Sequence, residues 1–436
     1  MNVREAALNS LIKCVSSDKF SNLELDSAIK KHDFSSSDKA FFTTLVYGVI
    51  EKKLTLDYVI GHFSSKPIDK IEDKLLHILR LGAYQIIYLD RTPDSAAVNE
   101  SVELAKKHTH NGTSGFVNGI LRNISRNKNA LPLPDRAADP MGYLSVKYSC
   151  PIWLCRKWCE DYGEEKAERL LCSVNVNPPI TLRVNTLKTT RDELIAELNE
   201  KGIEAEKTPY SENGIKLTQG VAVSELEALS DGRCFVQDEA SQLCVAALGA
   251  KGGETVIDTC SCPGGKSFGI GMDMHNEGRL ISLDLHESKL SLVKSGAMRL
   301  GISILDASVH NGSSPKEELI GKADRVLTDA PCSGLGVIAK KPDLRYKSPD
   351  DISRLPEIQY KILTSSSKYV KNGGILVYST CTLNKDENEG VVERFLKENS
   401  DFSLCCEGMP FGKAMLTLFP DEHNTDGFFI AKLRKN

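Results

Sequence analysis

Two cysteines follow two apolar, strand-like segments of the chain. Cys332 stands in "DAPCSG", directly after the segment "ADRVLTD", and Cys381 stands in "YSTCT", at the end of "GGILVYST". A single cysteine is most often a small buried apolar residue. A pair of cysteines at equivalent strand ends, one of them three residues after Asp329, instead indicates chemistry by a thiolate.

Two thiols and a carboxyl group suit the methylation of carbon 5 of a pyrimidine. Carbon 5 is a poor nucleophile, but addition of a thiolate to carbon 6 creates an enamine whose carbon 5 can attack an electrophilic methyl group. Asp329 would hydrogen-bond to the N3 and amino edge of cytosine, and a second group would help to remove the carbon 5 proton so that the thiol can leave. The spacing leaves open whether Cys332 or Cys381 attacks.

A glycine turn follows another strand-like segment, "ETVID", and could bring backbone close to a ligand. The turn "CSCPGGKS" ends like a phosphate-binding loop, but Cys260 stands where that motif needs glycine, and the nicotinamide fingerprint G-x-G-x-x-G is absent. Asp284 ends the next strand-like segment, 19 residues after Gly265, where a carboxylate can accept hydrogen bonds from ribose hydroxyls. The pattern favours a ligand that contains a nucleoside, with helix capping as the alternative role of Asp284.

The segments that carry these residues alternate with helical segments from residue 233 to the C-terminus. The predicted strands are "ETVID", "RLISLD", "SILDAS", "ADRVLTD", "GGILVYS" and "GFFIAKL". Such alternation is typical of a doubly wound parallel sheet, which binds ligands beyond the carboxyl ends of its strands. We therefore expect the glycine turn, Asp284, Asp306, Asp329 and the two thiols at one rim of the sheet.

The rest of the chain predicts two further domains. Residues 1–126 show apolar positions three and four apart and no strand alternation, which predicts an all-helical domain. A loop rich in proline follows over 127–142, and 143–232 mixes helices with short strands. The predicted domains are 1–130, 143–232 and 233–436.

Composition limits the class of protein. The chain has 41% hydrophobic and 26% charged residues and a net charge of −4, so its overall charge gives no argument for nucleic acid. Residues 1–130 alone carry 18 Lys and Arg against 15 Asp and Glu, an excess that could contact a polyanion or serve only solubility. No secretion signal or membrane-spanning run is evident, and the 13 scattered cysteines predict reduced thiols without a metal site, hence a cytoplasmic protein.

Two basic segments have alternative interpretations. "KKPDLRYK", shortly after Cys332, could contact phosphates beside an unstacked base, or could be a solvated loop. "RVNTLK" could present Arg183 and Asn185 to RNA, or could form only the edge of a sheet.

Five segments follow the catalytic motifs of a known family in order: "FVQDEASQL", "DTCSCPGGKS", "DAPCSGLGVIAKKPDLR", "STCTLNKDENEG" and "TDGFFIAKL". In them the chain resembles the bacterial 16S ribosomal RNA 5-methylcytosine methyltransferases of the RsmB, Sun or Fmu type. The segment "AVNESVELAKKH" is similar to the NusB-like RNA-binding domain of that family, and "ITLRVNTLK" to its small ferredoxin-like domain. The resemblance implies an all-α NusB-like domain, a small α+β ferredoxin-like domain and a C-terminal α/β Rossmann-like class I methyltransferase domain.

The resemblance also implies a reaction and a site. A methyl group would pass from S-adenosyl-L-methionine to carbon 5 of a cytosine in 16S rRNA, cytosine 967, through a cysteine adduct. Cys381 would be the nucleophile and Cys332 would assist release, so the implied catalytic residues are Cys381, Cys332, Asp329 and Lys266. The implied cofactor-binding residues are Cys260, Ser261, Cys262, Pro263, Gly264, Gly265, Lys266, Asp284 at the ribose, Asp306 near the adenine and Asp329 near the methyl donor.

The sequence departs from the family pattern at two places near this site. Cys262 stands where alanine is usual, and "LDA" around Asp306 stands where "GDA" is frequent. The expected partner is naked 16S rRNA or an early assembly intermediate, bound by a monomer. The alternatives are a transfer RNA cytosine methyltransferase on the same scaffold and an RNA-binding assembly factor without activity.

Overall fold

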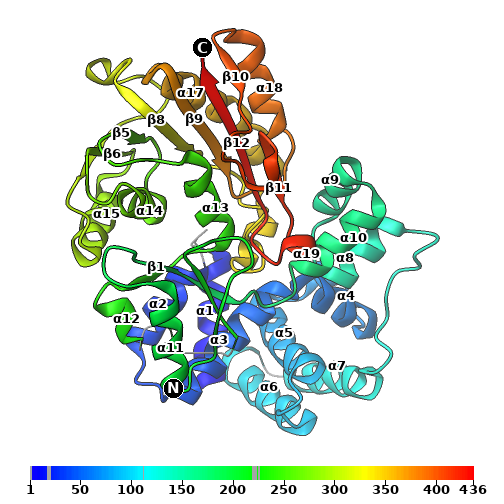
Figure 1. Cartoon of the computed structure of the whole chain (residues 1–436). Coiled ribbons are helices and arrows are strands. Elements are labelled where there is room, and N and C mark those ends of the chain that lie inside the picture. The colour runs from blue at the N-terminus through cyan, green and yellow to red at the C-terminus, as the bar shows by residue number, and fades with distance from the viewer. Residues whose placement is uncertain (1, 17–20, 111, 219–222, 224–225) are drawn as a thin grey trace. The chain divides into compact units, whose positions relative to one another are not determined.

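The computed structural model describes residues 2–16, 21–110, 112–218, 223 and 226–436 of the chain. The chain divides into two compact units, which are Met1–Val176 with Ile338–Lys347, and Asn177–Val337 with Ser348–Asn436. Figure 1 shows the helices and strands of both units in chain order by colour. The segment 338–347 follows the Cys332 loop in the sequence but packs with the helices of the first unit.

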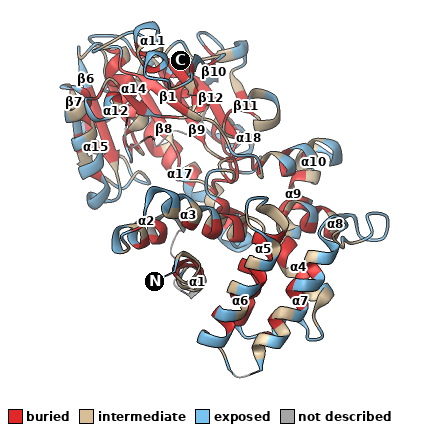
Figure 2. Cartoon of the chain, turned by 90° about the horizontal axis from the view of Figure 1, so that it is seen from below, coloured by how far each residue is buried: buried red, intermediate tan, exposed pale blue. Residues whose placement is uncertain are grey.

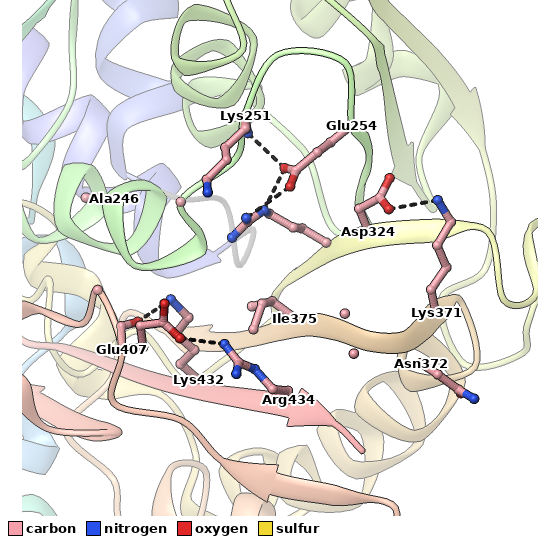
Figure 3. Close-up of a pocket in the computed structure, with 15 residues that line it drawn as sticks. Ala246, Lys251, Glu254, Asp324, Lys371, Asn372, Ile375, Glu407, Lys432 and Arg434 are labelled. Atoms are coloured by element: carbon pink, nitrogen blue, oxygen red, sulfur yellow. Dashed lines mark hydrogen bonds and ion pairs between the residues drawn. The ribbon is translucent and has the colours of Figure 1, made fainter.

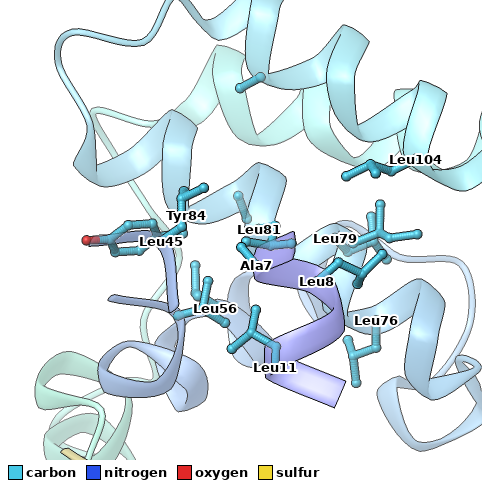
Figure 4. Close-up of a cluster of buried hydrophobic side chains, with 14 of the residues drawn as sticks. Ala7, Leu8, Leu11, Leu45, Leu56, Leu76, Leu79, Leu81, Tyr84 and Leu104 are labelled. Atoms are coloured by element: carbon cyan, nitrogen blue, oxygen red, sulfur yellow. The ribbon is translucent and has the colours of Figure 1, made fainter. Parts of the chain in front are cut away.

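The first unit is helical, as the sequence predicted. Its helices are α1 (Val3–Ser16), α2 (Ser21–Lys31), α3 (Ser36–Glu51), α4 (Lys53–Phe63), α5 (Asp73–Tyr88), α6 (Asp94–His108), α7 (Thr113–Asn127), α8 (Pro140–Tyr148), α9 (Ile152–Tyr162) and α10 (Glu164–Ser173). Helix α5 is buried at every position from Leu75 to Ile86, which is the pattern of a helix in the middle of a bundle. Leu8 of α1 and Leu45 of α3 belong to the same apolar core as Leu79 of α5 (Figure 4).

The last three of these helices, α8, α9 and α10, group with the first unit by their contacts. Helices α9 and α10 were predicted as part of the small α+β domain over 143–232, whereas α8 begins at Pro140, inside the predicted loop over 127–142. The boundaries predicted at residues 130, 143 and 232 stay a prediction about where the independently folding domains begin and end.

The segment 338–347 contributes a buried arginine to the first unit, from the short 3-10 helix η4 (Pro342–Tyr346). Arg345 is completely buried, and its guanidinium donates hydrogen bonds to the backbone oxygens of Glu51 and Ser149, both at 3.0 Å, and of Val174 at 3.3 Å. Arg345 therefore stabilises the packing of the first unit. The two interpretations of "KKPDLRYK", a phosphate contact and a solvated loop, do not apply to this residue.

The second unit contains a small antiparallel sheet. This sheet belongs to the part of the chain for which the sequence predicted a ferredoxin-like domain. The strand order is β2-β3-β1-β4, formed by β1 (Ile180–Val184), β2 (Ala205–Lys207), β3 (Gly214–Leu217) and β4 (Cys234–Val236). Helix α11 (Arg191–Glu200) begins with a capping box in which Thr190 and Glu193 satisfy each other's backbone N–H groups. The short helix α12 (Glu227–Ser230) precedes β4.

Arg183 and Asn185 lie at the end of β1 and point into the protein. The Arg183 guanidinium is buried and lies 2.8 Å from the carboxylate of Asp273. The Asn185 amide is fully buried and donates to the backbone oxygens of Gly232 and Leu300 at 2.7 and 2.8 Å. Both side chains are structural, so "RVNTLK" does not present them to RNA.

The large sheet of the second unit has the order β10-β12-β9-β8-β5-β6-β7, with β11 paired to β12. Its strands are β5 (Thr255–Asp258), β6 (Arg279–Asp284), β7 (Leu305–Val309), β8 (Ala323–Asp329), β9 (Val370–Thr380), β10 (Phe402–Leu404), β11 (Met415–Leu418) and β12 (Phe428–Lys435). The pairs from β7 through β6, β5 and β8 to β9 are parallel, as predicted.

The expectation of a wholly parallel sheet is wrong at one edge. Strand β12, the predicted "GFFIAKL", runs antiparallel to β9, and β10 and β11 run antiparallel to β12. An apolar segment predicts a buried strand but carries no information about its direction. Strands β10 and β11 are only three and four residues long, so their alternation was too short to recognise.

Helices cover both faces of the large sheet. The helices of this part of the chain are α13 (Glu239–Leu248), α14 (Gly265–Asp273), α15 (Glu287–Leu300), α16 (Pro349–Ser353), α17 (Leu355–Ser367), α18 (Glu389–Glu398) and α19 (Pro420–His423). Along β9, Val377 packs in one apolar cluster with residues of α13, while Leu376 and Tyr378 pack in another with residues of α17 and α18. Figure 2 shows these strands as buried ribbons. Successive side chains on opposite faces thus feed two separate cores.

The described part of the chain contains neither a membrane-spanning helix nor a cluster of metal-binding side chains. No helix there is long and apolar enough to cross a membrane. No group of three or more His, Cys, Asp and Glu side chains in those residues could hold a metal ion. All 13 cysteines are free thiols.

We predict that Arg345→Met destabilises the first unit by roughly 3 kcal/mol, because several buried oxygens lose their donor. Both tryptophans of the chain, Trp153 and Trp158, lie in α9 of this unit, so urea unfolding followed by tryptophan fluorescence reports on it. The exposed Arg126, changed to Met, is the matched control. Equal unfolding midpoints for the two variants would contradict the anchoring role of Arg345.

Candidate active site at the carboxyl ends of the strands

The parallel pairing of β8 with β9 brings the two predicted thiols together. Asp329 at the end of β8 is in register with Ser379 near the end of β9, so the loops that follow the two strands leave the sheet side by side. The sulfur atoms of Cys332 and Cys381 lie 3.3 Å apart in these loops, and both side chains are half-buried. This distance permits a hydrogen bond in which one thiol donates to the other sulfur.

The surroundings make the two thiols unequal. The hydrogen bond from Cys332 lowers the pKa of Cys381 below its ordinary value. Burial and the negative charge of Asp329 oppose this effect, and the positive charge of Lys266 supports it. The same hydrogen bond raises the pKa of Cys332, to which burial and the negative charges of Glu387 and Asp329 add. These opposite directions favour ionisation of Cys381 over ionisation of Cys332.

An ion pair borders the thiols. The Lys266 ammonium lies 2.6 Å from the carboxylate of Asp329, whose other oxygen accepts a hydrogen bond from the Ser379 hydroxyl at 2.8 Å. The same ammonium lies 4.9 Å from the centre of the Phe428 ring. Burial opposes the charged form, but Asp329 outweighs it and raises the pKa of Lys266, so this lysine stays positively charged. All four predicted catalytic residues, which are Cys381, Cys332, Asp329 and Lys266, therefore lie together in this site.

The glycine turn lies between β5 and α14, and a buried carboxyl group accepts hydrogen bonds from two of its residues. Asp258, at the end of β5, accepts a hydrogen bond from the Ser267 hydroxyl at 2.6 Å and one from the backbone N–H of Cys260 at 3.4 Å. Burial raises the pKa of Asp258 to about 7. Gly264 has a φ of 111°, and a Cβ there would lie 2.3 Å from the Phe268 ring, so the turn requires glycine at this position.

Asp284 at the end of β6 touches the same turn. One carboxylate oxygen accepts the backbone N–H of Cys262 at 3.1 Å, and the other accepts the backbone N–H of His286 at 3.0 Å, just before α15. The side chain is half-buried. The two roles weighed for Asp284 are thus compatible, since it holds the helix entry and stands beside the glycine turn. Burial, with the charge of Asp284, raises the pKa of Cys262 to about 12, so this extra thiol is a poor nucleophile.

Two buried polar atoms beside the turn have no hydrogen-bond partner among the residues that the structure describes. They are the Ser261 hydroxyl oxygen and the carboxamide oxygen of Gln237, and both residues are more than nine-tenths buried. The Gln237 amide nitrogen would lie 3.4 Å from a Cβ at Gly265, so it borders the glycine turn itself. Unsatisfied buried polar atoms are rare in folded proteins and need a partner. A ligand with hydrogen-bonding groups, such as a nucleoside or an amino acid moiety, fits this donor and acceptor set.

Asp306 is not at the rim where we expected it. It is the second residue of β7, it is exposed, and it pairs with Ile281 in the middle of β6. The residue of β7 in register with Asp284 is Val309, three residues later, which corresponds to about 10 Å along a strand. The strand begins later than the apolar segment "SILDAS" suggested, so its polar end is displaced and Asp306 is left out of the site.

Sequence reasoning missed three residues of this site. Asp258 is the last residue of the predicted strand "ETVID" and could have been found by its position. Gln237 lies in "FVQDEASQL", where it precedes Asp238 and Glu239 and no pattern distinguishes it from these polar neighbours. Glu387 lies in "KDENEG", a run of charged residues that is typical of solvent, yet its side chain is completely buried beside the Cys332 loop.

A cavity of about 520 Å³ lies at the other end of the large sheet. Its lining comes from the amino ends of β5, β8 and β9 and from the end of β12, about 20 Å along β9 from the thiol loops. Carboxylates neutralise several of its cations. Arg325 lies 2.6 Å from Glu254, and Figure 3 shows Lys371 beside Asp324, at 2.8 Å. It is a polar hollow bordered by ion pairs and is separate from the thiol site.

The fold and the site together define a class of protein. A Rossmann-like sheet with a glycine turn after one strand and a carboxylate at the end of the next is the arrangement of a nucleoside-binding α/β enzyme. The unequal thiol pair adds a nucleophile.

Comparison with known proteins agrees with this class. Residues 245–434 match the model of the 16S rRNA methyltransferase RsmB/F family, residues 1–126 that of the NusB family, and residues 150–224 that of the ferredoxin-like domain of RsmF/B-like methyltransferases. The probable ribosomal RNA small subunit methyltransferase B of Bacillus subtilis is 42% identical over 100% of this chain and 99% of its own length. A protein of the same description from Synechocystis is 36% identical, with 96% of each chain covered.

A solved structure gives the same result for the fold. The crystal structure of PH0851 superposes with a TM-score of 0.83 at 28% identity and covers 100% of this chain and 98% of its own. The chain belongs to the ribosomal RNA small subunit methyltransferase B family, as the motifs had indicated.

We predict that Asp258→Asn changes the pH dependence of stability. The folded-state pKa of Asp258 is raised from 3.8 to about 7. The contribution of this group to the free energy of unfolding is therefore fully present below pH 3.8 and is lost as the pH rises through 7. Asparagine stays neutral, so the melting temperature of the variant relative to wild type should rise steadily between these values. Calorimetry from pH 4 to 8 measures the difference, with the exposed Asp306→Asn as control. A difference that stays constant with pH would contradict the prediction.

Proposed function

We propose that the protein transfers a methyl group from S-adenosyl-L-methionine to carbon 5 of a cytosine in 16S rRNA, through a covalent cysteine adduct. The observation that carries the proposal is the unequal thiol pair, 3.3 Å apart, beside the ion pair of Lys266 and Asp329. The position we expect is cytosine 967, in naked 16S rRNA or an early assembly intermediate, and we expect the enzyme to act as a monomer.

The residues of the glycine turn would hold the cofactor. Cys260 to Lys266 would offer backbone and the unpaired Ser261 hydroxyl, and Asp284 would accept hydrogen bonds from the ribose. The bound cofactor supplies an electrophilic methyl group, while the protein orients it and excludes water. Asp258 fixes the turn from inside the domain.

The chain's own residues would act on the cytosine. The Cys381 thiolate would form a bond to carbon 6, and the electron pair of the 5,6 double bond would move to carbon 5. Carbon 5 would take the methyl group from the cofactor, whose sulfur keeps the electron pair of the broken bond. The Asp329 carboxylate accepts a hydrogen bond from the cytosine amino group, and Lys266 supplies positive charge at the same edge. The positive charge of Lys266 would make carbon 6 more electrophilic, while the Asp329 carboxylate would orient the base.

Release of the product would depend on Cys332. Once Cys381 is bound to carbon, it no longer carries the negative charge that raised the pKa of Cys332, so Cys332 can lose its proton to solvent. Its thiolate then removes the carbon 5 proton, the 5,6 double bond forms again, and the sulfur–carbon bond breaks with its electron pair returning to Cys381. The enzyme ends with Cys381 as thiolate and Cys332 as thiol.

Ribosomal RNA is favoured as substrate by the names of the relatives, which are called ribosomal RNA small subunit methyltransferase B. The test is transfer of labelled methyl from S-adenosyl-L-methionine to unmethylated 16S rRNA, with digestion to nucleosides and mapping of the label. Labelled 5-methylcytidine at one position supports the proposal. Transfer to tRNA alone would keep the chemistry and replace the substrate, and tight RNA binding without transfer would favour an assembly factor.

We predict that Cys381→Ser lowers transfer by about 10³-fold or more, because a hydroxyl is far less ionised than this thiol. The initial rate of label transfer measures the effect. Cys172→Ser, at an exposed cysteine of the first unit, is the matched control and should retain full activity. Near wild-type activity of the Cys381 variant would eliminate the proposed nucleophile.

We predict that Cys332→Ala traps the adduct. Attack by Cys381 remains possible, but removal of the carbon 5 proton should slow by about 10²-fold or more. A protein–RNA band should therefore accumulate on denaturing gels in the presence of cofactor and disappear in the double variant with Cys381→Ser. Free turnover without such a band would overturn the division of roles between the two thiols.

A further inference from the structure

A buried carboxylate joins the loop of one thiol to the loop of the other. One oxygen of Glu387 accepts the backbone N–H of Ser333 and the side-chain amide of Gln359, both at 2.8 Å. The other oxygen accepts the side-chain amide of Asn384 at 3.0 Å. Ser333 directly follows Cys332, while Asn384 lies in the Cys381 loop. All three donors are neutral groups, and the carboxylate has no exposed surface.

Two further contacts join these loops. The hydroxyls of Ser333 and Thr382, the residues that directly follow the two cysteines, lie 2.6 Å apart. The backbone N–H of Gly336 donates to the carbonyl of Cys381 at 3.0 Å. A Cβ at Gly336 would lie 2.9 Å from that carbonyl oxygen, so the loops approach as closely as glycine permits.

Helix α17 completes the arrangement from the other side. The Gln359 amide donates both to Glu387 and to the backbone oxygen of Pro331 at 2.9 Å, the residue before Cys332. The backbone on each side of Cys332 is thus tied, through Gln359 and Ser333, to one carboxylate. A carboxylate without a cation is costly to bury, so its presence here calls for a specific role.

We propose that Glu387 is a positioning residue that holds the two thiol loops together and keeps the proton of the pair on Cys332. The inference deepens the proposed function, because it concerns the same two thiols. A fixed negative charge beside Cys332 opposes a second negative charge on that sulfur, whereas Cys381 faces the ammonium of Lys266. The other charged groups that face the pair are the carboxylates of Asp329 and Asp426.

Glu387→Gln tests the charge with little change of shape. The glutamine oxygen can still accept from Ser333 and Gln359, while the amide nitrogen loses the bond to Asn384 and the negative charge disappears. Cys332 should then ionise more readily and compete with Cys381. Limited alkylation of the full-length protein with iodoacetamide at pH 8, followed by mass spectrometry of the peptides, measures the labelling of each thiol.

We expect the ratio of labelling at Cys381 to labelling at Cys332 to fall about tenfold in Glu387→Gln, the effect of one unit of pKa. The turnover number for methyl transfer should fall by a similar factor. Glu389→Gln is the matched control, since the carboxylate of this nearby glutamate accepts a hydrogen bond from the Thr417 hydroxyl. Labelling of the buried Cys244 reports on unfolding in each variant. An unchanged ratio with Cys244 protected would overturn the proposal.

A second variant covers the case in which Glu387→Gln does not fold. Thr382→Val removes the hydroxyl contact with Ser333 but leaves the carboxylate in place. Transfer should fall several-fold while alkylation still prefers Cys381, and undiminished transfer would count against positioning by the joined loops.

The alkylation readout needs neither RNA nor cofactor, so it separates two failures. A shifted ratio in a protein that methylates no cytosine would reject the proposed function and keep the role of Glu387. Methylation of cytosine with an unshifted ratio would do the reverse.

Discussion

The chemistry of this protein depends on the parallel pairing of two neighbouring strands. Because β8 and β9 run in the same direction with Asp329 in register with Ser379, both loops leave the sheet at the same height. A shift of one residue would turn every side chain of a strand to the other face. The apolar residues of β9 feed separate cores on the two faces, and this burial fixes the register that sets the sulfur–sulfur distance.

Groups of opposite charge lie beside the two thiols. Lys266 and its positive charge approach from the glycine turn, while Glu387 approaches from beneath the Cys332 loop. Two chemically identical side chains thereby differ in their readiness to lose a proton. The difference comes first from the hydrogen bond between the two sulfurs and then from the charges that lie beside each of them.

Much of this arrangement could be predicted from the sequence, because strand ends are local features. Apolar segments that end in Asp284, Asp329 or a cysteine showed which residues share a rim. The predicted position of Asp306 at the rim was wrong because the start of β7 depends on pairing with β6. The predicted direction of β12 was wrong because an apolar segment does not show which way its strand runs in the sheet. Glu387 was missed since its burial is created by Gln359 and by the Cys332 loop, 54 residues earlier in the chain.

The placement of Arg345 has a consequence for how the gene can change. The first unit is not encoded by one continuous stretch, because Arg345 enters from a short segment far downstream of residue 176. A recombination event that exchanged only the upstream coding region would join helices to an arginine selected for another set of carbonyl groups. Two regions of the gene, separated by more than a hundred codons, are therefore both needed to complete the first unit.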